Sequence, residues 1–147
     1  GIGLLAVCDI TIAVPEVQFA FSEVKLGIIP AVISTFVASR MTPATMRRFF
    51  ITGERFDTLT AQRIGLIDLV VPPERLDETI SSCVEQVRSS GPTAIKEVKG
   101  LIYHRQKMNI KEYKDFTVEK ISELRVSPEG QEGINAFLEK RKPRWKR

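Results

Sequence analysis

The chain has 147 residues, of which 43% are hydrophobic and 27% are charged, and it carries a net charge of +4 at pH 7. These proportions are those of an ordinary globular protein, and the sequence contains no run of about 18 apolar residues that would predict a membrane-spanning helix. Cys8 and Cys83 give neither a disulfide framework nor the spacing of a metal site, so we expect small core residues in a reduced compartment.

The first half of the chain predicts short strands interleaved with helices. Alternating or β-branched apolar residues predict strands, at 9–14, 17–21 and 67–71. Small residues, prolines at helix starts and glycines at helix ends predict helices, at 1–7, 31–41, 44–51 and from Thr58 or Thr60 to Gly65.

The second half predicts a string of helices without strands. An apolar face repeats at helical spacing after Leu76, and glycine, proline and capping residues separate the segments that follow. These signals predict helices at 76–89, 93–107, from Asn109 or Lys111 to Leu124, and from Ser127 or Pro128 to about Arg141.

Glu23 is the residue that most directly suggests chemistry. It is a lone carboxylate at the end of the apolar run 17–21, and Gly27 and Pro30 follow closely. An apolar surrounding disfavours the charged form of a carboxylic acid and brings its proton exchange towards neutral pH. The alternative is a surface glutamate at a strand end, and this segment alone leaves both interpretations open.

The positive charge is concentrated towards the C-terminal end. Residues 140–147 carry six lysine and arginine side chains around Trp145, the only tryptophan. Such a run can bind nucleic acid or a phosphate group, although a solvated basic terminus is the commoner case. One aromatic ring among basic residues is weak evidence for base stacking, so we do not expect a nucleic-acid partner.

Four motifs, in order, resemble the enoyl-CoA hydratase/isomerase (crotonase) superfamily. Residues 1–13 resemble the small-residue helix and Cys-Asp-Ile strand that follow the family's Gly-Gly-Gly turn. Residues 19–30 resemble Phe-x-x-Pro-Glu-x-x-x-Gly-x-x-Pro. Residues 52–72 resemble Thr-Gly-x-x-x followed by Ala-x-x-x-Gly-Leu-Val-x-x-Val-x-Pro, and residues 132–141 resemble Glu-Gly-x-x-Ala-Phe-x-Glu-Lys-Arg. Each motif is weak alone, but together they span the chain.

The resemblance implies an α/β fold with a crotonase-like spiral of ββα turns at 1–73 and a helical trimerisation region at 74–147. The family domain is nearly twice as long, so we expect the C-terminal half of such a domain, with further sequence before Gly1. The resemblance also implies a homotrimer or a dimer of trimers without a membrane partner. Its expected location is the cytoplasm or, in a eukaryote, the mitochondrial matrix.

The resemblance further implies acyl-CoA thioester chemistry with no metal and no covalently bound cofactor, because coenzyme A is part of the substrate. Two backbone N–H groups would stabilise the thioester oxygen as an enolate forms. One donor would belong to the residue before Gly1, so Gly1 borders this oxyanion hole. The family's hydratases use two glutamates for proton transfer. Glu23 matches one of them, and Gly3 stands at the position of the other.

A single acid/base group leaves the reaction open. Our first expectation is hydration or dehydration of a 2-enoyl-CoA through Glu23. The alternatives are a Δ3,Δ2-enoyl-CoA isomerase, which needs one base, and a non-catalytic member that binds acyl-CoA or RNA. Where hydratases have a Gly-rich run, Ala31 begins a bulkier run that predicts a drier wall beside Glu23. This version resembles a methylglutaconyl-CoA hydratase-like subgroup, in which Lys25 or Arg40 could meet a substrate carboxylate.

Phe137 and Lys140 fall where the family's C-terminal helix packs on coenzyme A, often that of a neighbouring subunit. The resemblance implies that Phe137 contacts the adenine and that Lys140 contacts a phosphate. From spacing alone, the alternative is a core phenylalanine and a solvated lysine.

Overall fold

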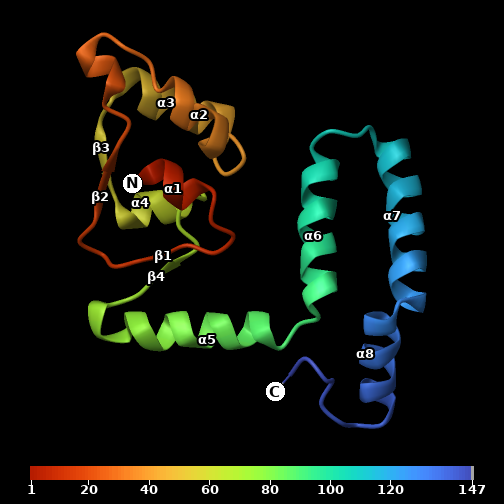
Figure 1. Cartoon of the computed structure of the whole chain (residues 1–147). Coiled ribbons are helices and arrows are strands. Elements are labelled where there is room, and N and C mark those ends of the chain that lie inside the picture. The colour runs from red at the N-terminus through yellow and green to blue at the C-terminus, as the bar shows by residue number, and fades with distance from the viewer. Residues whose placement is uncertain (147) are drawn as a thin grey trace. The chain divides into compact units, whose positions relative to one another are not determined.

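A computed structural model describes residues 1–146, and the chain divides into two compact units, Gly1–Ser81 and Ser82–Arg147 (Figure 1). The division falls inside helix α5 (Leu76–Arg88). The first unit mixes helices with short strands, which are, in chain order, α1 (Ile2–Ala6), β1 (Ile12–Ala13), β2 (Gln18–Ala20), η1 (Glu23–Leu26), α2 (Ala31–Val37), α3 (Pro43–Thr52), β3 (Arg55–Asp57), α4 (Thr58–Arg63), β4 (Leu69–Val70) and η2 (Pro73–Arg75). The second unit holds α6 (Pro92–Arg105), α7 (Ile110–Val126) and α8 (Pro128–Leu138).

The strands form two small ladders. Strand β1 pairs in parallel with β4, and β2 pairs antiparallel with β3, which places Phe19 opposite Phe56. The strands predicted at 9–14, 17–21 and 67–71 are all longer than the observed ones. Strand β4 is short for two reasons. The side chain of Asp68, the residue before the strand, bonds to Thr11, and a proline pair closely follows the strand. Strand β3 was not predicted, since its one apolar residue lies between two charged ones.

Aromatic rings form the centre of the first unit. The Phe49 and Phe56 ring centroids lie 4.3 Å apart, and Phe19 stacks on Phe56 at 5.7 Å. Aromatic contacts of this kind add to the free energy gained from apolar burial. The core residues are contributed by strands and helices alike and comprise Ala6, Phe19, Phe21, Val37, Met41, Phe49, Phe56, Ala61, Leu66 and Ile67.

Two helices end three or more residues earlier than predicted. Helix α2 ends at Val37 rather than near residue 41, because the N–H groups that follow it turn back onto its last carbonyls. Helix α8 ends at Leu138 rather than Arg141. Lys140 has a left-handed φ of 53°, and the Arg141 N–H bonds to the Ala136 carbonyl, which closes the helix with a reversal of the chain.

In the second unit, α7 packs against α6 and α8. Side chains satisfy the N–H groups that a helix start leaves without partners. Ser127 accepts from the Gly130 N–H at 3.0 Å at the start of α8, and Glu129 accepts from the Thr93 and Ala94 N–H groups at the start of α6. Within residues 1–146, no helix is both long and apolar enough to cross a membrane.

The prediction that the two cysteines are core residues is wrong. Cys8 is exposed and its thiol donates to the Leu4 carbonyl at 3.3 Å, while Cys83 is only half-buried on α5. Cys8 follows the end of α1, where the chain leaves the core to reach β1.

Candidate functional site

Glu23 begins η1, two residues after the buried Phe21, and Ser22 between them is the N-cap. Gly27 closes this turn with φ 74°, and its N–H bonds to the Glu23 and Val24 carbonyls. The Glu23 side chain is half-buried. Within residues 1–146, no hydrogen bond or ion pair engages its carboxylate. The η1 turn, which Gly27 closes, therefore presents an unpaired carboxylate that can give or accept a proton.

The C-terminal end of α3 packs against this turn. Gly53 ends α3 in a left-handed conformation with φ 55°. A Cβ at Gly53 would lie 3.0 Å from Val24 Cγ1 and 3.1 Å from Lys25 Cε, so η1 rests closely on a position without a side chain. This contact fixes the backbone that carries Glu23. Gly53 and the η1 residues that it contacts lie far apart in the sequence.

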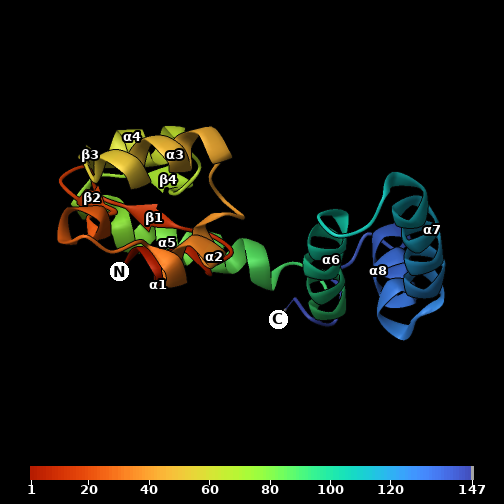
Figure 2. The same ribbon diagram turned by 90° about the horizontal axis from the view of Figure 1, so that it is seen from above.

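Gly1 and Gly3 lie at the start of α1, which packs against α2 (Figure 2). Gly1 is the N-cap, and its carbonyl accepts from the Leu5 N–H at 3.1 Å. A Cβ at Gly3 would lie 3.6 Å from Ile33 Cγ1 on α2. The position predicted for a missing catalytic glutamate is therefore bordered by an aliphatic side chain, and it offers no acid of its own.

Ala31 is the first residue of α2, after the buried Pro30. Its N–H bonds to the Ile29 carbonyl at 2.8 Å, and Ala31 itself is exposed. Of the bulky residues that follow, Ile33 lies towards Gly3, whereas Val32 is 78% exposed. The packed pair of α1 and α2 thus carries Gly1 and Gly3 on one helix and Ala31 and Ile33 on the other.

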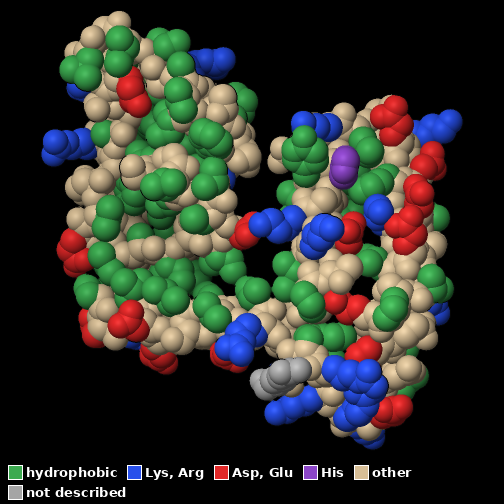
Figure 3. Space-filling model, viewed as in Figure 1, with side chains coloured by type: hydrophobic (Ala, Val, Ile, Leu, Met, Phe, Trp, Pro, Cys, Tyr) green, Lys and Arg blue, Asp and Glu red, His purple; other side chains and the backbone are tan. Residues whose placement is uncertain are grey.

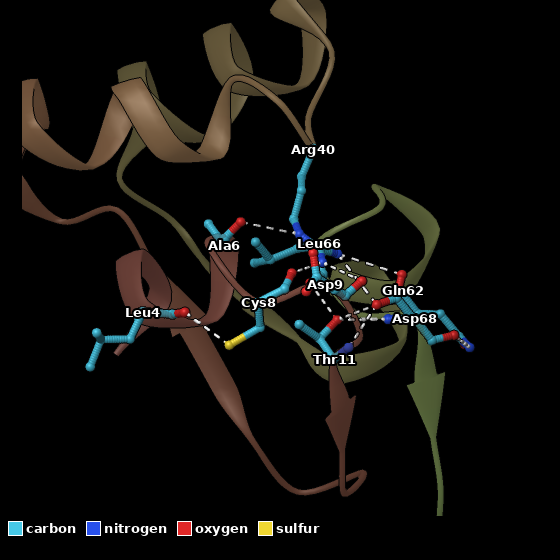
Figure 4. A network of polar contacts seen from close by, with 9 residues as sticks. All are labelled: Leu4, Ala6, Cys8, Asp9, Thr11, Arg40, Gln62, Leu66 and Asp68. Atoms are coloured by element: carbon cyan, nitrogen blue, oxygen red, sulfur yellow. Dashed lines mark hydrogen bonds and ion pairs between the residues drawn. The ribbon is translucent and has the colours of Figure 1, made fainter. Parts of the chain in front are cut away.

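Arg40, which follows α2, bonds to the chain that leaves α1 (Figure 4). Its Nε donates to the Ala6 carbonyl at 3.3 Å, and its Nη2 donates to the Cys8 and Asp9 carbonyls. Its Nη1 lies 3.4 Å from Asp68 Oδ2. The side chain is only 14% exposed, so this guanidinium is engaged inside the unit and is not available for the substrate carboxylate suggested above.

Thr11 and Asp68 join the segment before β1 to the segment before β4. The Thr11 N–H donates to Asp68 Oδ2 at 2.7 Å, its hydroxyl lies 2.8 Å from the same oxygen, and the Asp68 N–H donates to that hydroxyl. Burial acts to raise the pKa of Asp68, but these hydrogen bonds and Arg40 hold it below the ordinary value. We missed this pair in the sequence, where an aspartate inside an apolar run was the available signal.

Phe137 and Lys140 lie at the end of α8 in the second unit. Phe137 is 82% exposed and Lys140 is also exposed, so Phe137 is not a core residue of this unit. Figure 3 shows blue, basic side chains gathered at the C-terminal end of the same unit. An exposed ring close to cationic side chains can bind a flat, negatively charged ligand.

Part of the basic C-terminal run is neutralised within the unit. Arg141 donates to both carboxylate oxygens of Glu132, at 2.6 and 3.1 Å, and Arg144 Nε lies 3.6 Å from the same carboxylate. The hydrogen bonds from Arg141 lower the pKa of Glu132 to about 2. The indole N–H of Trp145 donates to the Ser89 carbonyl, so its half-buried ring takes part in the packing of the unit.

Comparison with known proteins defines the class. The Enoyl-CoA hydratase/isomerase family profile matches residues 1–147, and the chain therefore belongs to this family. The fold is the α/β fold of the crotonase-like enoyl-CoA hydratases, as the sequence motifs predicted.

Three relatives show how close the similarity is. The structure of an enoyl-CoA hydratase from Shewanella pealeana has a TM-score of 0.92 at 39% identity, over 98% of this chain and 54% of its own. An enoyl-CoA hydratase/isomerase from Marinobacter aquaeolei gives a TM-score of 0.95 at 34% identity, over 100% of this chain and 56% of its own. The Short-chain-enoyl-CoA hydratase of Clostridium acetobutylicum is 32% identical over 136 residues, 92% of this chain and 52% of that protein. The chain thus spans about half the length of the relatives it matches.

Proposed function

We propose that the full-length protein hydrates a 2-enoyl-CoA, or dehydrates the corresponding hydroxyacyl-CoA, with Glu23 as the general acid/base. The observation that carries this proposal is the half-buried, unpaired carboxylate of Glu23 on a backbone clamped by Gly27 and Gly53. Membership of the enoyl-CoA hydratase/isomerase family supports the substrate class.

Hydration needs two proton transfers, one from the attacking water and one to the α-carbon next to the thioester. In hydration, the oxygen of water bonds to the β-carbon and loses a proton to a base, for which the Glu23 carboxylate is the candidate. The double-bond electrons move through the α-carbon onto the thioester oxygen, and an enolate forms. The α-carbon then takes a proton from an acid, for which Glu23 is the candidate. Backbone N–H groups beside Gly1 would stabilise the enolate oxygen, because fixed donors are most effective where charge develops.

A double-bond isomerase is the second candidate, and the environment of Gly3 favours it. Isomerisation removes a proton from one carbon of the acyl chain and returns it two carbons further on, so one base is sufficient. Gly3 supplies no second acid, and Ile33 borders that position with an aliphatic group that cannot hold a water by hydrogen bonding. Glu23 would carry the proton in both reactions.

The coenzyme A part of the substrate is proposed to contact the end of α8. Phe137 would contact the adenine ring and Lys140 a phosphate, which suits an exposed aromatic ring and a flexible ammonium group. No further cofactor is needed for either reaction, since the thioester itself activates the neighbouring carbon. We place the proton chemistry in residues 1–73 and coenzyme A binding and homotrimer formation in residues 74–147.

The test is to incubate the full-length protein with a panel of 2-enoyl-CoA and 3-enoyl-CoA thioesters. Loss of the conjugated thioester absorbance reports hydration, and product analysis reports movement of the double bond. Hydroxyacyl-CoA as the main product supports the first candidate, and 2-enoyl-CoA formed from 3-enoyl-CoA supports the second. No turnover of any member of the panel would contradict both.

A further inference from the structure

The C-terminal motif forms a closed network of contacts, which we call the clasp and define as Glu132, Gly133, Arg141, Arg144 and Trp145. Glu132 is its centre, because its carboxylate accepts from Arg141 Nη1 at 2.6 Å and from the Arg144 backbone N–H at 3.0 Å. Arg141 Nε donates to Glu139 at 2.6 Å as well. The Glu132 side chain is only 14% exposed, so solvent screens this network less than an isolated surface pair.

Trp145 anchors the far end of the clasp. Its indole N–H donates to the Ser89 carbonyl at 3.2 Å. A Cβ at Gly133 would lie 3.1 Å from Trp145 Cη2, so the ring approaches α8 closely at a position without a side chain. The tail after α8 is therefore fastened to the preceding part of the unit at two points, Glu132 and Ser89.

Between the helix and these anchors, the chain makes a single sharp reversal. Lys140 takes the left-handed φ of 53°, and the Arg141 N–H returns to the Ala136 carbonyl at 3.0 Å. A left-handed lysine is strained relative to glycine, so surrounding contacts must hold it. Arg141, the next residue, supplies those contacts through Glu132 and Glu139.

We infer that the clasp positions Phe137 and Lys140 for the nucleotide part of coenzyme A, and that Glu132, Arg141 and Trp145 are positioning residues for acyl-CoA binding. The inference rests on the proposed function, which assigns Phe137 and Lys140 to coenzyme A. The same geometry explains why Arg141 and Arg144 do not act as free cations, since both are turned to Glu132. Lys140 keeps its charge directed to solvent at the reversal.

The experiment uses Trp145 as an intrinsic reporter, since it is the only tryptophan among these 147 residues, and Trp145→Phe in the full-length protein gives the emission to be subtracted. Glu132→Gln and Arg141→Lys are made in the full-length protein, with Glu123→Gln as the matched control. Glu123 pairs with Lys120 at 2.8 Å on α7 and is 54% exposed, so the control removes the same charge from an ion pair outside the clasp. Tryptophan emission and acrylamide quenching report the state of the clasp, and calorimetry with free coenzyme A gives the affinity.

We expect Glu132→Gln to move the Trp145 emission towards that of a solvated indole and to weaken coenzyme A binding by about tenfold. The KM for an acyl-CoA should rise by a similar factor with kcat little changed, which a general loss of folding would not produce. Arg141→Lys should fall between Glu132→Gln and wild type, since one ammonium cannot reach both carboxylates as the guanidinium does. Glu123→Gln should match wild type in every measurement.

The outcomes separate the inference from the proposed function. An altered emission with unchanged coenzyme A affinity would overturn the positioning role and leave the clasp as a structural fastening. An unchanged emission in Glu132→Gln would show that Glu132 does not hold the tail. A wild-type protein that binds coenzyme A but turns over no thioester would contradict the proposed reaction alone. A wild-type protein that does not bind coenzyme A would contradict the assignment of Phe137 and Lys140 and, with it, the positioning role.

Discussion

At the scale of single residues, two left-handed glycines of the first unit are under different constraints. Gly65 has φ +82°, and a Cβ there would lie 2.8 Å from the Arg40 carbonyl oxygen. Gly27 has φ +74°, but no atom lies within 4 Å of the corresponding position. Backbone conformation alone favours glycine at both positions, whereas the close approach of another part of the chain applies only at Gly65.

The first prediction separates the free-energy cost of a left-handed backbone from the cost of the close approach. Gly65→Ala should lower the free energy of unfolding by about 2 kcal/mol or more, and Gly27→Ala by about 1 kcal/mol. The difference arises because the new methyl group at Gly65 meets the backbone carbonyl of Arg40, which cannot move aside as a flexible side chain can. Denaturant unfolding of both variants measures it, and equal losses would show that the contact with Arg40 carries no cost.

At the scale of elements, one polar cluster connects the end of α1 with both strands of the parallel ladder. Arg40 fastens the segment after α1, and the pair of Thr11 and Asp68 fastens the segments that enter β1 and β4. Two-residue strands gain little from their own ladder, so these side-chain contacts set the register of the pair. The contacts of Asp68 with the Thr11 N–H and with Arg40 are stronger when its carboxylate is charged.

The pH dependence follows from the direction of the pKa shift. The folded protein holds the pKa of Asp68 below its ordinary value of 3.8, so its contribution is fully present above that pH and is lost as the pH falls through the lower folded value. The difference in unfolding free energy between wild type and Asp68→Asn should therefore be constant above about pH 5 and shrink as the pH falls below about 4. Denaturant titrations at several pH values measure this difference.

Asp115→Asn, at an exposed position of α7, is the control for that series and should track wild type throughout. A constant gap between wild type and Asp68→Asn down to about pH 3 would mean that protonation of Asp68 does not weaken the contacts between β1 and β4.

Predictions from the sequence were successful where the signal is local. The apolar face at 76–89 is helix α5, and Thr42-Pro43 opens α3 as its capping signal indicated. The motif around Glu23 was found because glycine and proline punctuate it. What could not be predicted depends on partners far along the chain: the hydrogen bonds between Thr11 and Asp68 link residues 57 positions apart. The contact of Gly53 with Val24, which supports Glu23, is likewise tertiary.

At the scale of the whole molecule, apolar surface points to assembly. Within each unit, large aliphatic side chains remain exposed, and Figure 3 shows green, hydrophobic side chains over much of the visible face of the first unit. In the second unit, α6 and α7 form an apolar groove that includes Val98, Val118 and Ile121. Surfaces of this extent are typical of contacts with other polypeptides.

We therefore expect the full-length protein to be a homotrimer or a dimer of trimers. Light scattering after size-exclusion chromatography should give a mass of three or six protomers that is constant on dilution. A monomer mass across the concentration range would contradict this expectation.

The most direct test of the central claim compares Glu23→Gln with Glu16→Gln in the full-length protein. Glu16 is an exposed glutamate of the same unit, so both variants lose one carboxylate. We expect Glu23→Gln to lower kcat by about a thousandfold with nearly unchanged coenzyme A affinity, because the side chain transfers a proton and does not bind the nucleotide. Glu16→Gln should retain wild-type turnover. Turnover by Glu23→Gln close to that of wild type would contradict the assignment of Glu23 as the acid/base of this site.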